Sequence, residues 1–390
     1  MTATTPFDVE ALLEELVRLD SRNPDLSPDS PGEGPIAARL AEVLTGLGLE
    51  VAVLPAVDGR PNVIGVLQGT VGHATVVFEA HLDTVPAEPE TMRVRTEGRL
   101  LFGRGTCDTK GSLASMVGAA ERMSKIEGPR PTIVIAGVAD EEYIMRGARE
   151  LLGHLPKVDA VVIGEPTSML PVRAHNGFIR VRAVVTGIAA HSSKAHLGVN
   201  AIAGAAIAIA RLEQRLGSIL SANPDPVSGP AYLTPTMIEG GIAPNVVPDR
   251  CEIWYDRRLS PDETADDALA DIETVLQELR DVDGLQIHLD QPIVALHGFN
   301  ASPESPLVVS AERAVKTVLG QDVEAGGVTY STDACYLAGL GNLPCVILGP
   351  GSIDQAHAIV EWVDLDEVVK TVDVYVELAM EFDRMVTVAP

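Results

Sequence analysis

Short apolar segments that alternate with helical stretches constrain the fold of this chain more than any other feature of its sequence. Each is bounded by turn residues, and they lie at 51–54, 62–67, 75–80, 132–138, 159–164 and 344–349. Apolar residues at helical spacing predict helices over 7–19, 35–48 and 111–125. Strands that alternate with helices predict an α/β domain with a mostly parallel sheet that helices cover on both faces.

The middle of the chain follows a different pattern. Strands are expected at 178–187, 234–241, 251–259 and 285–290, and helices at 198–217 and 261–280. Their order, βαββαβ, is that of a small ferredoxin-like sandwich. Because 390 residues exceed the usual size of one domain, we predict that residues 175–290 form a second domain. It is inserted into a first domain made of residues 1–174 and 291–390, and 291–298 is expected to lead back to the main sheet.

Composition narrows the possible partners and the location. The chain has 29 basic and 55 acidic residues, a formal charge of −26, which disfavours nucleic acid and anionic membranes as partners. The sequence contains no apolar stretch of about 20 residues, so we predict no membrane-spanning helix. The N-terminus lacks the basic and apolar regions of a signal peptide. The four cysteines are scattered, as is typical of a reducing cytoplasm, so we expect a cytoplasmic protein.

Polar clusters follow the predicted strands of the first domain, where open α/β sheets build their sites. They contain His81 and Asp83; Asp108 in GRGTCDTKG; Asp140, Glu141 and Glu142 in ADEEY; Glu165 in GEPT; and His357 and Glu361 in QAHAIVEW.

Two histidines with three carboxylates form a mixed nitrogen and oxygen set that suits two zinc-like ions sharing one carboxylate. Such a pair of ions activates water and polarises a carbonyl group. Asp83 lies two residues after His81, on the same face of a strand, where it can accept the free ring N–H of a metal-bound histidine. Each cluster taken alone also reads as an ordinary turn, a helix cap or a surface histidine. On spacing and chemistry alone, both interpretations stay open.

The sequence resembles the co-catalytic zinc amidohydrolases that include acetylornithine deacetylase, succinyl-diaminopimelate desuccinylase, aminoacylase and carboxypeptidase G. The matching segments follow the family's order over most of the chain: HLDTVP (81–86), GRGTCDTKG (103–111), DEE (140–142), GEPT (164–167), AHSSKAHLGVNAI (190–202), NVVPD (245–249), DRRLSPDE (256–263) and GPG…QAH (349–357).

The resemblance implies a role for each clustered residue. One zinc ion is expected on His81 and Glu165 and a second on Glu142 and His357, with Asp108 bridging them. Cobalt or manganese are possible substitutes. Glu141 is expected to be the general base, and Asp83 the partner that orients His81.

The resemblance also makes the inserted domain a lid that carries the interface of a homodimer. His191 is expected to reach the partner subunit's site and stabilise the oxyanion of the intermediate. Arg258 is expected to receive the substrate carboxylate, with Asn245 near the same place. The neighbouring Arg257 leaves the choice of arginine open, since strand neighbours face opposite sides.

Four positions depart from the family pattern. Ala80, Thr109 and Ala195 stand where glycine, methionine and proline are common, and HAIVEW lacks the usual proline-acid run. None of these changes removes a ligand.

The resemblance therefore implies a dimeric di-zinc enzyme that hydrolyses an amide bond next to a free carboxylate. N-acyl-L-amino acids of the acetylornithine or succinyl-diaminopimelate kind are the expected substrates. A dipeptidase or carboxypeptidase acting on short peptides is the alternative, and the choice depends on the lid and on residues 326–334. A homologue that binds amino-acid-like ligands without hydrolysis is a third reading, although it has no need for Glu141.

Overall fold

The computed structural model describes residues 7–279 and 284–387. Its contacts divide the chain into a first unit, residues 1–173, 301–326 and 332–390, and a second unit, residues 174–300 and 327–331. The second unit thus extends about ten residues beyond the sequence-based boundary at 290. The reason is β15 (Val294–Leu296), which pairs with β9 (Gly177–Thr186) in the second unit's sheet. The chain then continues into β16 (Phe299–Asn300), which pairs with β8 (Val172–His175) of the large sheet, as expected for a segment that leads back to it.

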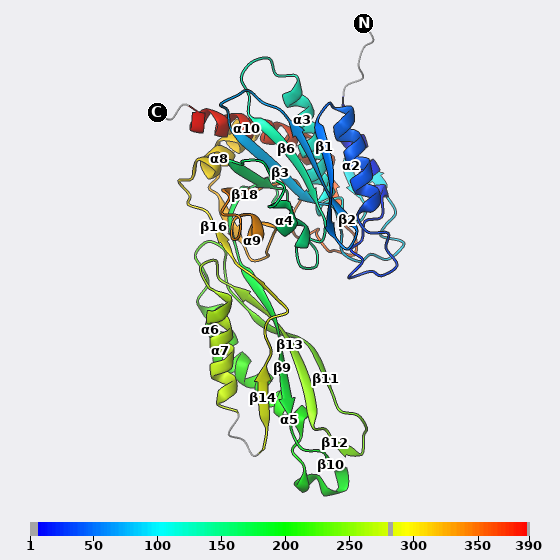
Figure 1. The fold of residues 1–390 in the computed structure, drawn as a ribbon, viewed down its shortest axis with the longest axis vertical. Helices are drawn as coiled ribbons and strands as arrows, with labels where there is room; N and C mark the ends of the chain where they lie inside the picture. Colours follow the sequence, from blue (N-terminus) through cyan, green and yellow to red (C-terminus); the bar gives the residue numbers. More distant parts are fainter. Residues whose placement is uncertain (1–6, 280–283, 388–390) are drawn as a thin grey trace. The chain divides into compact units, whose positions relative to one another are not determined.

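The first unit is built on a large mixed sheet (Figure 1). Its strand order is β1 (Glu50–Val57), β2 (Arg60–Leu67), β6 (Thr132–Val138), β3 (Thr75–His81), β7 (Ala160–Ile163), β18 (Cys345–Ile347) and β8 (Val172–His175). The central strands β6, β3, β7 and β18 are parallel, and the pairs β1/β2, β2/β6 and β18/β8 are antiparallel. The α/β class is therefore confirmed, with the parallel part confined to the centre of the sheet.

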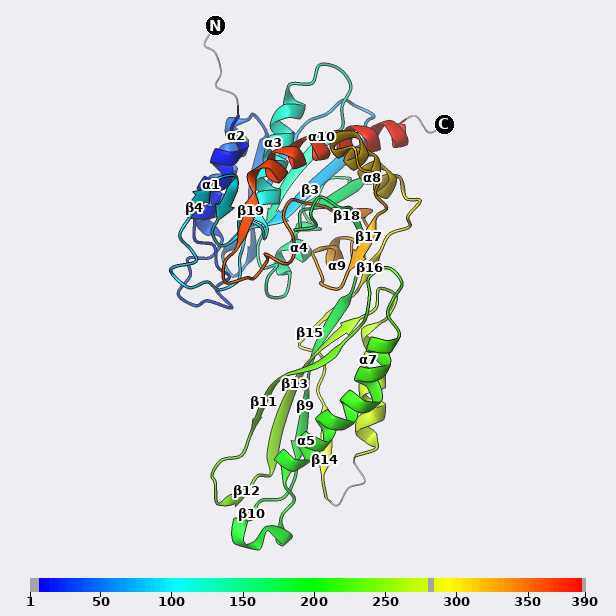
Figure 2. The ribbon, with the colours of Figure 1, turned by 180° about the vertical axis from the view of Figure 1, so that it is seen from behind.

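Helices bury the apolar side chains of these strands. The first unit contains α1 (Val9–Arg18), α2 (Gly34–Gly46), α3 (Lys110–Ser124), α4 (Arg146–Leu151), α8 (Pro306–Leu319), α9 (Ala334–Leu337) and α10 (Leu365–Thr387). Figures 1 and 2 show α3 and α10 together on one face of the sheet, with α4 and α9 on the other. Val76, Phe78 and Ala80 of β3 lie in the core that includes α3 and α10, so the alternate residues of β3 face away from these two helices.

A small three-stranded sheet lies beside this core and connects two distant parts of the chain. It consists of β19 (Trp362–Asp364), β5 (Leu100–Phe102) and β4 (Arg95–Glu97), in that order. Trp362 pairs with Phe102, so the residues just before β19 lie beside the residues just after β5. These flanking residues include His357 and Asp108, two of the predicted metal ligands.

The second unit has the predicted βαββαβ order. Its antiparallel sheet is ordered β11 (Leu233–Gly240), β13 (Arg250–Leu259), β9 and β14 (Gln286–Leu289), covered by α5 (Ala201–Leu212) and α7 (Ala265–Gln277). Shorter elements are β10 (Ala190–His191), η1 (Ser192–Leu197), η2 (Glu213–Gly217), α6 (Ser218–Ala222) and β12 (Val246–Val247). Two further short strands, β16 (Phe299–Asn300) and β17 (Gly326–Val328), pair with β8 in the large sheet. Burial along β13 alternates, with Cys251, Ile253 and Tyr255 in the core.

Both helices of the second unit begin a few residues later than the sequence predicts. Asn200 caps α5 by accepting the backbone N–H of Ala203. Thr264 and Asp267 form a capping box at the start of α7, so the proline at 261 lies outside the helix. Local capping by side chains therefore sets these ends.

No helix in residues 7–279 and 284–387 is long and apolar enough to cross a membrane.

Candidate metal centre

The predicted ligands of the first unit come from the ends of its central strands. His81 is the last residue of β3, Glu141 and Glu142 follow β6, and Glu165 follows β7. Asp108 precedes α3. The carboxyl ends of parallel strands meet at one edge of a sheet, which is why residues so distant in sequence converge here.

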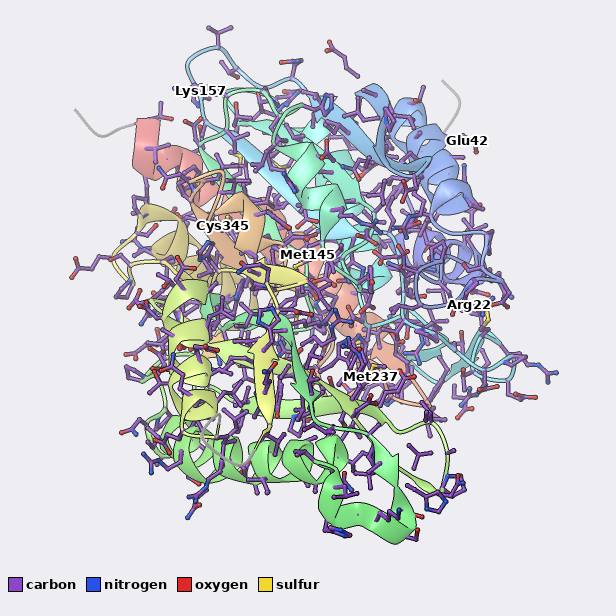
Figure 3. The ribbon with its side chains drawn as sticks, turned by 60° about the horizontal axis from the view of Figure 1, so that its bottom comes forward. Arg22, Glu42, Met145, Lys157, Met237 and Cys345 are labelled. Atoms are coloured by element: carbon purple, nitrogen blue, oxygen red, sulfur yellow. The ribbon has the colours of Figure 1, made fainter. Side chains whose placement is uncertain are left out.

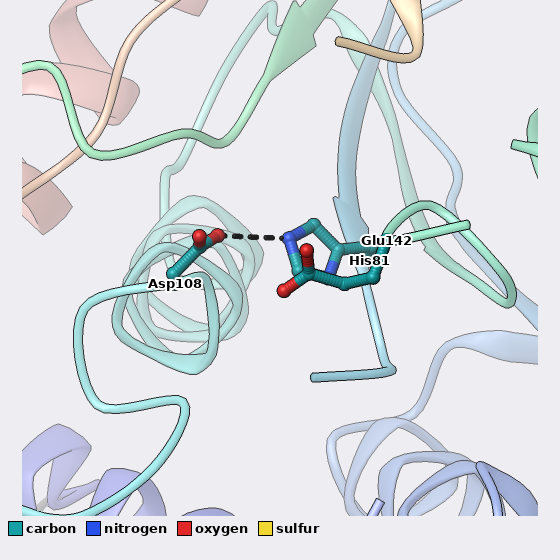
Figure 4. A group of neighbouring side chains, drawn as sticks. All are labelled: His81, Asp108 and Glu142. Carbon is teal, nitrogen blue, oxygen red and sulfur yellow. Dashed lines mark hydrogen bonds and ion pairs between the residues drawn. The ribbon is translucent and has the colours of Figure 1, made fainter. Parts of the chain in front are cut away.

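His81 is the centre of the first group of donor atoms. Its Nε2 atom lies 3.0 Å from Oδ1 of Asp108 and 4.0 Å from Oε1 of Glu165. Figure 4 shows the ring of His81 and the carboxylate of Asp108 facing each other. The imidazole is 1% exposed, and donor atoms of Glu141 and Glu165 also lie within 4.8 Å of it and of one another. This group is therefore buried and rigidly placed.

His357 forms the second group with the other oxygen of Asp108. Its Nε2 atom lies 3.3 Å from Oδ2 of Asp108 and 2.9 Å from Oε2 of Glu142. The second oxygen of Glu142 is buried and accepts no hydrogen bond from any described residue. Asp108 thus presents one oxygen to each histidine, as a bridging carboxylate would.

These distances fit a pair of metal ions. Two ligand atoms bound about 2.0–2.1 Å from a tetrahedral zinc ion lie about 3.3 Å apart. The donor atoms that surround Asp108 are separated by 2.9 to 4.0 Å. Two imidazole nitrogens with three carboxylates are also a donor set that zinc, cobalt and manganese accept.

The charges at the site favour the same interpretation. Burial, together with the nearby charge of Asp108, raises the pKa of Glu142 to about 7. Burial also raises the pKa values of Glu141 and Glu165 well above the usual range. Hydrogen bonds with Asp108 and Glu142 raise the pKa of His357 to about 11. The carboxylates are so crowded that they need bound cations, which in the absence of metal are protons.

Asp83 is completely buried at this site, but it contacts a different group from the one predicted. The Nδ1 atom of His81 is 2.9 Å from the backbone oxygen of Asp83, whereas the nearest carboxylate oxygen is 3.7 Å away. The carboxylate instead accepts the backbone N–H groups of Glu141 and Glu142 at 3.1 Å and the side chain of Asn23 at 2.8 Å. Asp83 therefore holds the turn that presents the general-base candidate.

Sequence reasoning missed Glu79 and Asp333. Both are 1% exposed, each shifts the pKa of the other, and no group of the described residues donates a hydrogen bond to either carboxyl. Burial raises the pKa of Glu79 to about 8, and burial together with the nearby charge of Glu79 raises the pKa of Asp333 well above its usual range. A signal was present, because Glu79 is a charged residue inside an apolar strand, two residues before His81.

The remaining predicted residues lie in the second unit. Arg257 is fully buried, donates to Glu263 and lies on the core face of β13. The side chain of Arg258 is 31% exposed, lies over the ring of Phe178 at 5.3 Å and contacts Asp256 at 2.8 Å. Of the two arginines, only Arg258 is accessible to a ligand.

His191 and Asn245 lie together in the second unit, remote from Arg258. His191 pairs with Val246 in the β10/β12 ribbon, next to Asn245, and both are exposed. Arg258 pairs with Phe178 at the start of β9, and the ribbon follows the other end of β9, past Thr186. The eight steps of strand from residue 178 to residue 186 span roughly 27 Å. An N-acyl amino acid, about two residues long, spans about 7 Å.

Comparison with models of protein families identifies the family of this chain. Residues 77–381 match Peptidase family M20/M25/M40, a range that includes all five predicted metal ligands. The chain belongs to this family, and it is accordingly a hydrolase, as the sequence resemblance predicted.

Two curated proteins with similar sequences carry the same name. Acetylornithine deacetylase of Vibrio vulnificus (strain CMCP6) is 32% identical over 357 residues, which cover 88% of this chain and 90% of that protein. The protein of the same name from Vibrio atlanticus (strain LGP32) is 30% identical over 353 residues, with the same coverage.

Solved structures share the fold. Aminopeptidase PepT from Bacillus cereus ATCC 10987 is 25% identical with a TM-score of 0.77, over 97% of this chain and all of that one. A tripeptidase from Staphylococcus aureus subsp. aureus Mu50 gives a TM-score of 0.80 at 21% identity, over 96% of this chain and 98% of that one.

Proposed function

We propose that this protein is a di-zinc hydrolase that removes the acyl group from an N-acyl-L-amino acid. The observation that carries the proposal is the position of Asp108, with one oxygen facing His81 and the other facing His357. Cobalt or manganese can replace zinc in such a donor set. The name shared by the curated relatives, acetylornithine deacetylase, supports a small N-acyl amino acid as the substrate.

Glu141 is the proposed general base. When bound, the two ions supply Lewis-acid polarisation of the amide carbonyl and lower the pKa of water. Glu141 accepts the proton of the attacking water on its carboxylate and delivers it to the leaving nitrogen. Asp83 supports this role because its carboxylate fixes the backbone of Glu141.

Arg258 is the proposed partner of the substrate carboxylate. Its guanidinium group is accessible, planar and held over Phe178, and a forked donor suits a carboxylate. This contact accounts for the expected preference for an amide bond beside a free carboxylate. A dipeptidase or carboxypeptidase activity needs the same residues and stays the alternative.

We also propose a homodimer formed through the second unit. Because roughly 27 Å of strand separates Arg258 from the ribbon that carries His191, the two residues of one chain do not fit one small substrate. The proposal is that His191 and Asn245 serve the partner's site. The edge strand β11 supports an interface, since Met237, labelled in Figure 3, is 61% exposed and Ile238 is also exposed.

The cytoplasm is the proposed location. All four cysteines are free and buried, as is typical of proteins that stay in a reducing compartment.

Metal content and substrate cleavage, measured on the same sample, test the proposed function. The panel contains acetylornithine, succinyl-diaminopimelate, several N-acetyl amino acids and a few dipeptides, each assayed before and after chelation. We expect two zinc ions per chain and chelator-sensitive cleavage of an N-acyl amino acid. Cleavage of dipeptides alone would replace the proposal by its alternative, and a protein without metal or activity would refute both.

A further inference from the structure

Glu361 is a buried acid that none of the roles above uses. It lies four residues after His357, directly before β19, and is 3% exposed. A carboxylate so deep in a protein needs hydrogen-bond donors, and their identity shows what it does.

All of its donors come from the loop that carries Asp108. Oε1 accepts the backbone N–H groups of Cys107 at 2.9 Å and Asp108 at 3.0 Å. Oε2 accepts the N–H of Gly105 at 2.9 Å and Nη1 of Arg104 at 2.7 Å. Since each oxygen already accepts two hydrogen bonds from protein groups, Glu361 is placed to hold this loop and not a metal ion.

The same contacts tie the loop to the segment that carries His357. Arg104 donates through Nη2 to the backbone oxygen of Ala358 at 3.0 Å, and Gly103 donates to the backbone oxygen of Glu361 at 3.1 Å. The pairing of β5 with β19 continues this connection. Asp108 and His357, whose reactive atoms are 3.3 Å apart, are therefore fixed to each other through Glu361 and Arg104.

A neutral residue does not replace this carboxylate. Four donors point at two oxygens, whereas a glutamine offers one oxygen and one NH₂ group. In either orientation, the NH₂ group of glutamine would face two donors and leave them without an acceptor.

We propose that Glu361 is a positioning residue that fixes the bridging carboxylate of Asp108 relative to His357, and so sets the affinity of the site for its ions. The proposal rests on the proposed metal-binding function. It assigns the ion held by Glu142 and His357 the greater dependence on Glu361, because two of that ion's three protein ligands lie on the segments that Glu361 connects.

The test is a zinc titration of metal-free Glu361→Gln against a competing chelating dye. Loss of a group that orients a ligand typically weakens metal binding about 10–100-fold, and we expect a rise of this size in at least one of the two dissociation constants. The absorption spectrum of the cobalt-loaded variant should also change. At saturating metal, kcat should fall while KM stays within about twofold, since no substrate contact is altered.

Glu367→Gln is the matched control. The Glu367 carboxylate accepts the backbone N–H of Gly351 at 2.8 Å, and no hydrogen bond of the described residues joins it to residues 103–108. Both dissociation constants should match those of the wild-type protein. Equal weakening by Glu361→Gln and Glu367→Gln would overturn the proposal, as would a Glu361→Gln protein with a lower melting temperature and unchanged zinc affinity.

If Glu361→Gln fails to fold, Arg104→Gln tests whether the contacts of Glu361 set the zinc affinity. This change removes one donor to Glu361 and the contact with Ala358 but leaves the three backbone donors. A weaker shift in zinc affinity in the same direction is expected, and unchanged affinity in a folded Arg104→Gln protein would refute the proposal. A wild-type protein that binds no zinc would instead refute the proposed function itself.

Discussion

The candidate metal ligands of the first unit and the candidate substrate residues of the second unit are held in opposite ways. His81, Asp108 and Glu165 are buried, and the two carboxylates lie 3.0 and 4.0 Å from Nε2 of His81. His191 is exposed, and its described hydrogen bonds are to Ser193, two residues away. One chain therefore brings its candidate metal ligands together by folding, whereas we propose that the groups of the second unit meet their partners outside the chain, in a substrate or a second subunit.

Glu141→Gln should produce the largest change in kcat. It tests the candidate metal centre, whose ligands all come from one chain. Loss of a general base lowers kcat by about 10²–10⁴-fold. Zinc content should stay the same, because the five proposed ligands are intact. Both quantities are measured on one preparation, with the exposed Glu150→Gln as control. Wild-type turnover in Glu141→Gln would remove Glu141 from the mechanism.

His191→Ala should have the next largest effect, on the side of the comparison that needs a second chain. Loss of an oxyanion donor lowers kcat by about 10²–10³-fold, again with unchanged zinc content. His196→Ala, another exposed histidine of the same loop, is the control.

Mixed dimers sharpen this second prediction. A dimer of one His191→Ala chain and one Glu141→Gln chain contains one site with both residues intact if His191 acts across the interface. Activity should therefore recover when the two inactive proteins are mixed. If it does not recover although mixed dimers form, His191 serves its own chain.

Arg258→Ala should raise KM by about 10–100-fold for substrates with a free carboxylate, because a charged hydrogen bond is lost. Amide-capped analogues should be unaffected. Arg257→Ala should instead lower the free energy of unfolding by about 3–5 kcal/mol, since it leaves Glu263 without its buried partner. Kinetics and denaturant unfolding of both variants separate the two roles, and the same result for both would contradict the assignment.

A change of pH should give the smallest effect, and it acts on the candidate metal centre of the first unit. The raised pKa of His357, about 11, keeps its ring protonated in the metal-free protein at neutral pH. A binding ion must displace this proton, so zinc affinity should fall as pH falls, by about tenfold per unit for each proton released. Zinc titrations between about pH 6.5 and about pH 8.5 measure this slope. A flat profile would mean that the ring is neutral before metal binds.

The convergence of the candidate metal ligands could be predicted from the sequence, because they are side chains that follow apolar segments. The hydrogen-bond partner of His81 could not be predicted from the sequence, since the group that accepts the ring N–H is a backbone carbonyl. Any residue at position 83 supplies such a carbonyl, so nothing in the sequence marks it. The second role of Asp83, which binds backbone N–H groups of Glu141 and Glu142, leaves no pattern for the same reason.

The choice between Arg257 and Arg258 was within reach. Cys251, Ile253 and Tyr255 alternate along the strand, and the same period places Arg257 on the apolar face. The separation of His191 from Arg258 could not be predicted from the sequence, because it depends on the antiparallel register of β9 with β13 and on the β10/β12 ribbon that follows β9.

The hydrogen bonds of Glu361 also determine which substitutions the loop of residues 104–108 can accept in related sequences. Three of its four bonds go to backbone N–H groups, those of residues 105, 107 and 108. These three bonds depend on the backbone and not on the side chains of the loop, so they require only that none of these positions becomes proline, which has no N–H. A mutational scan of residues 104–107 should find proline excluded at 105 and 107 and alanine tolerated at 107. Glu361 itself should tolerate no substitution without loss of metal affinity.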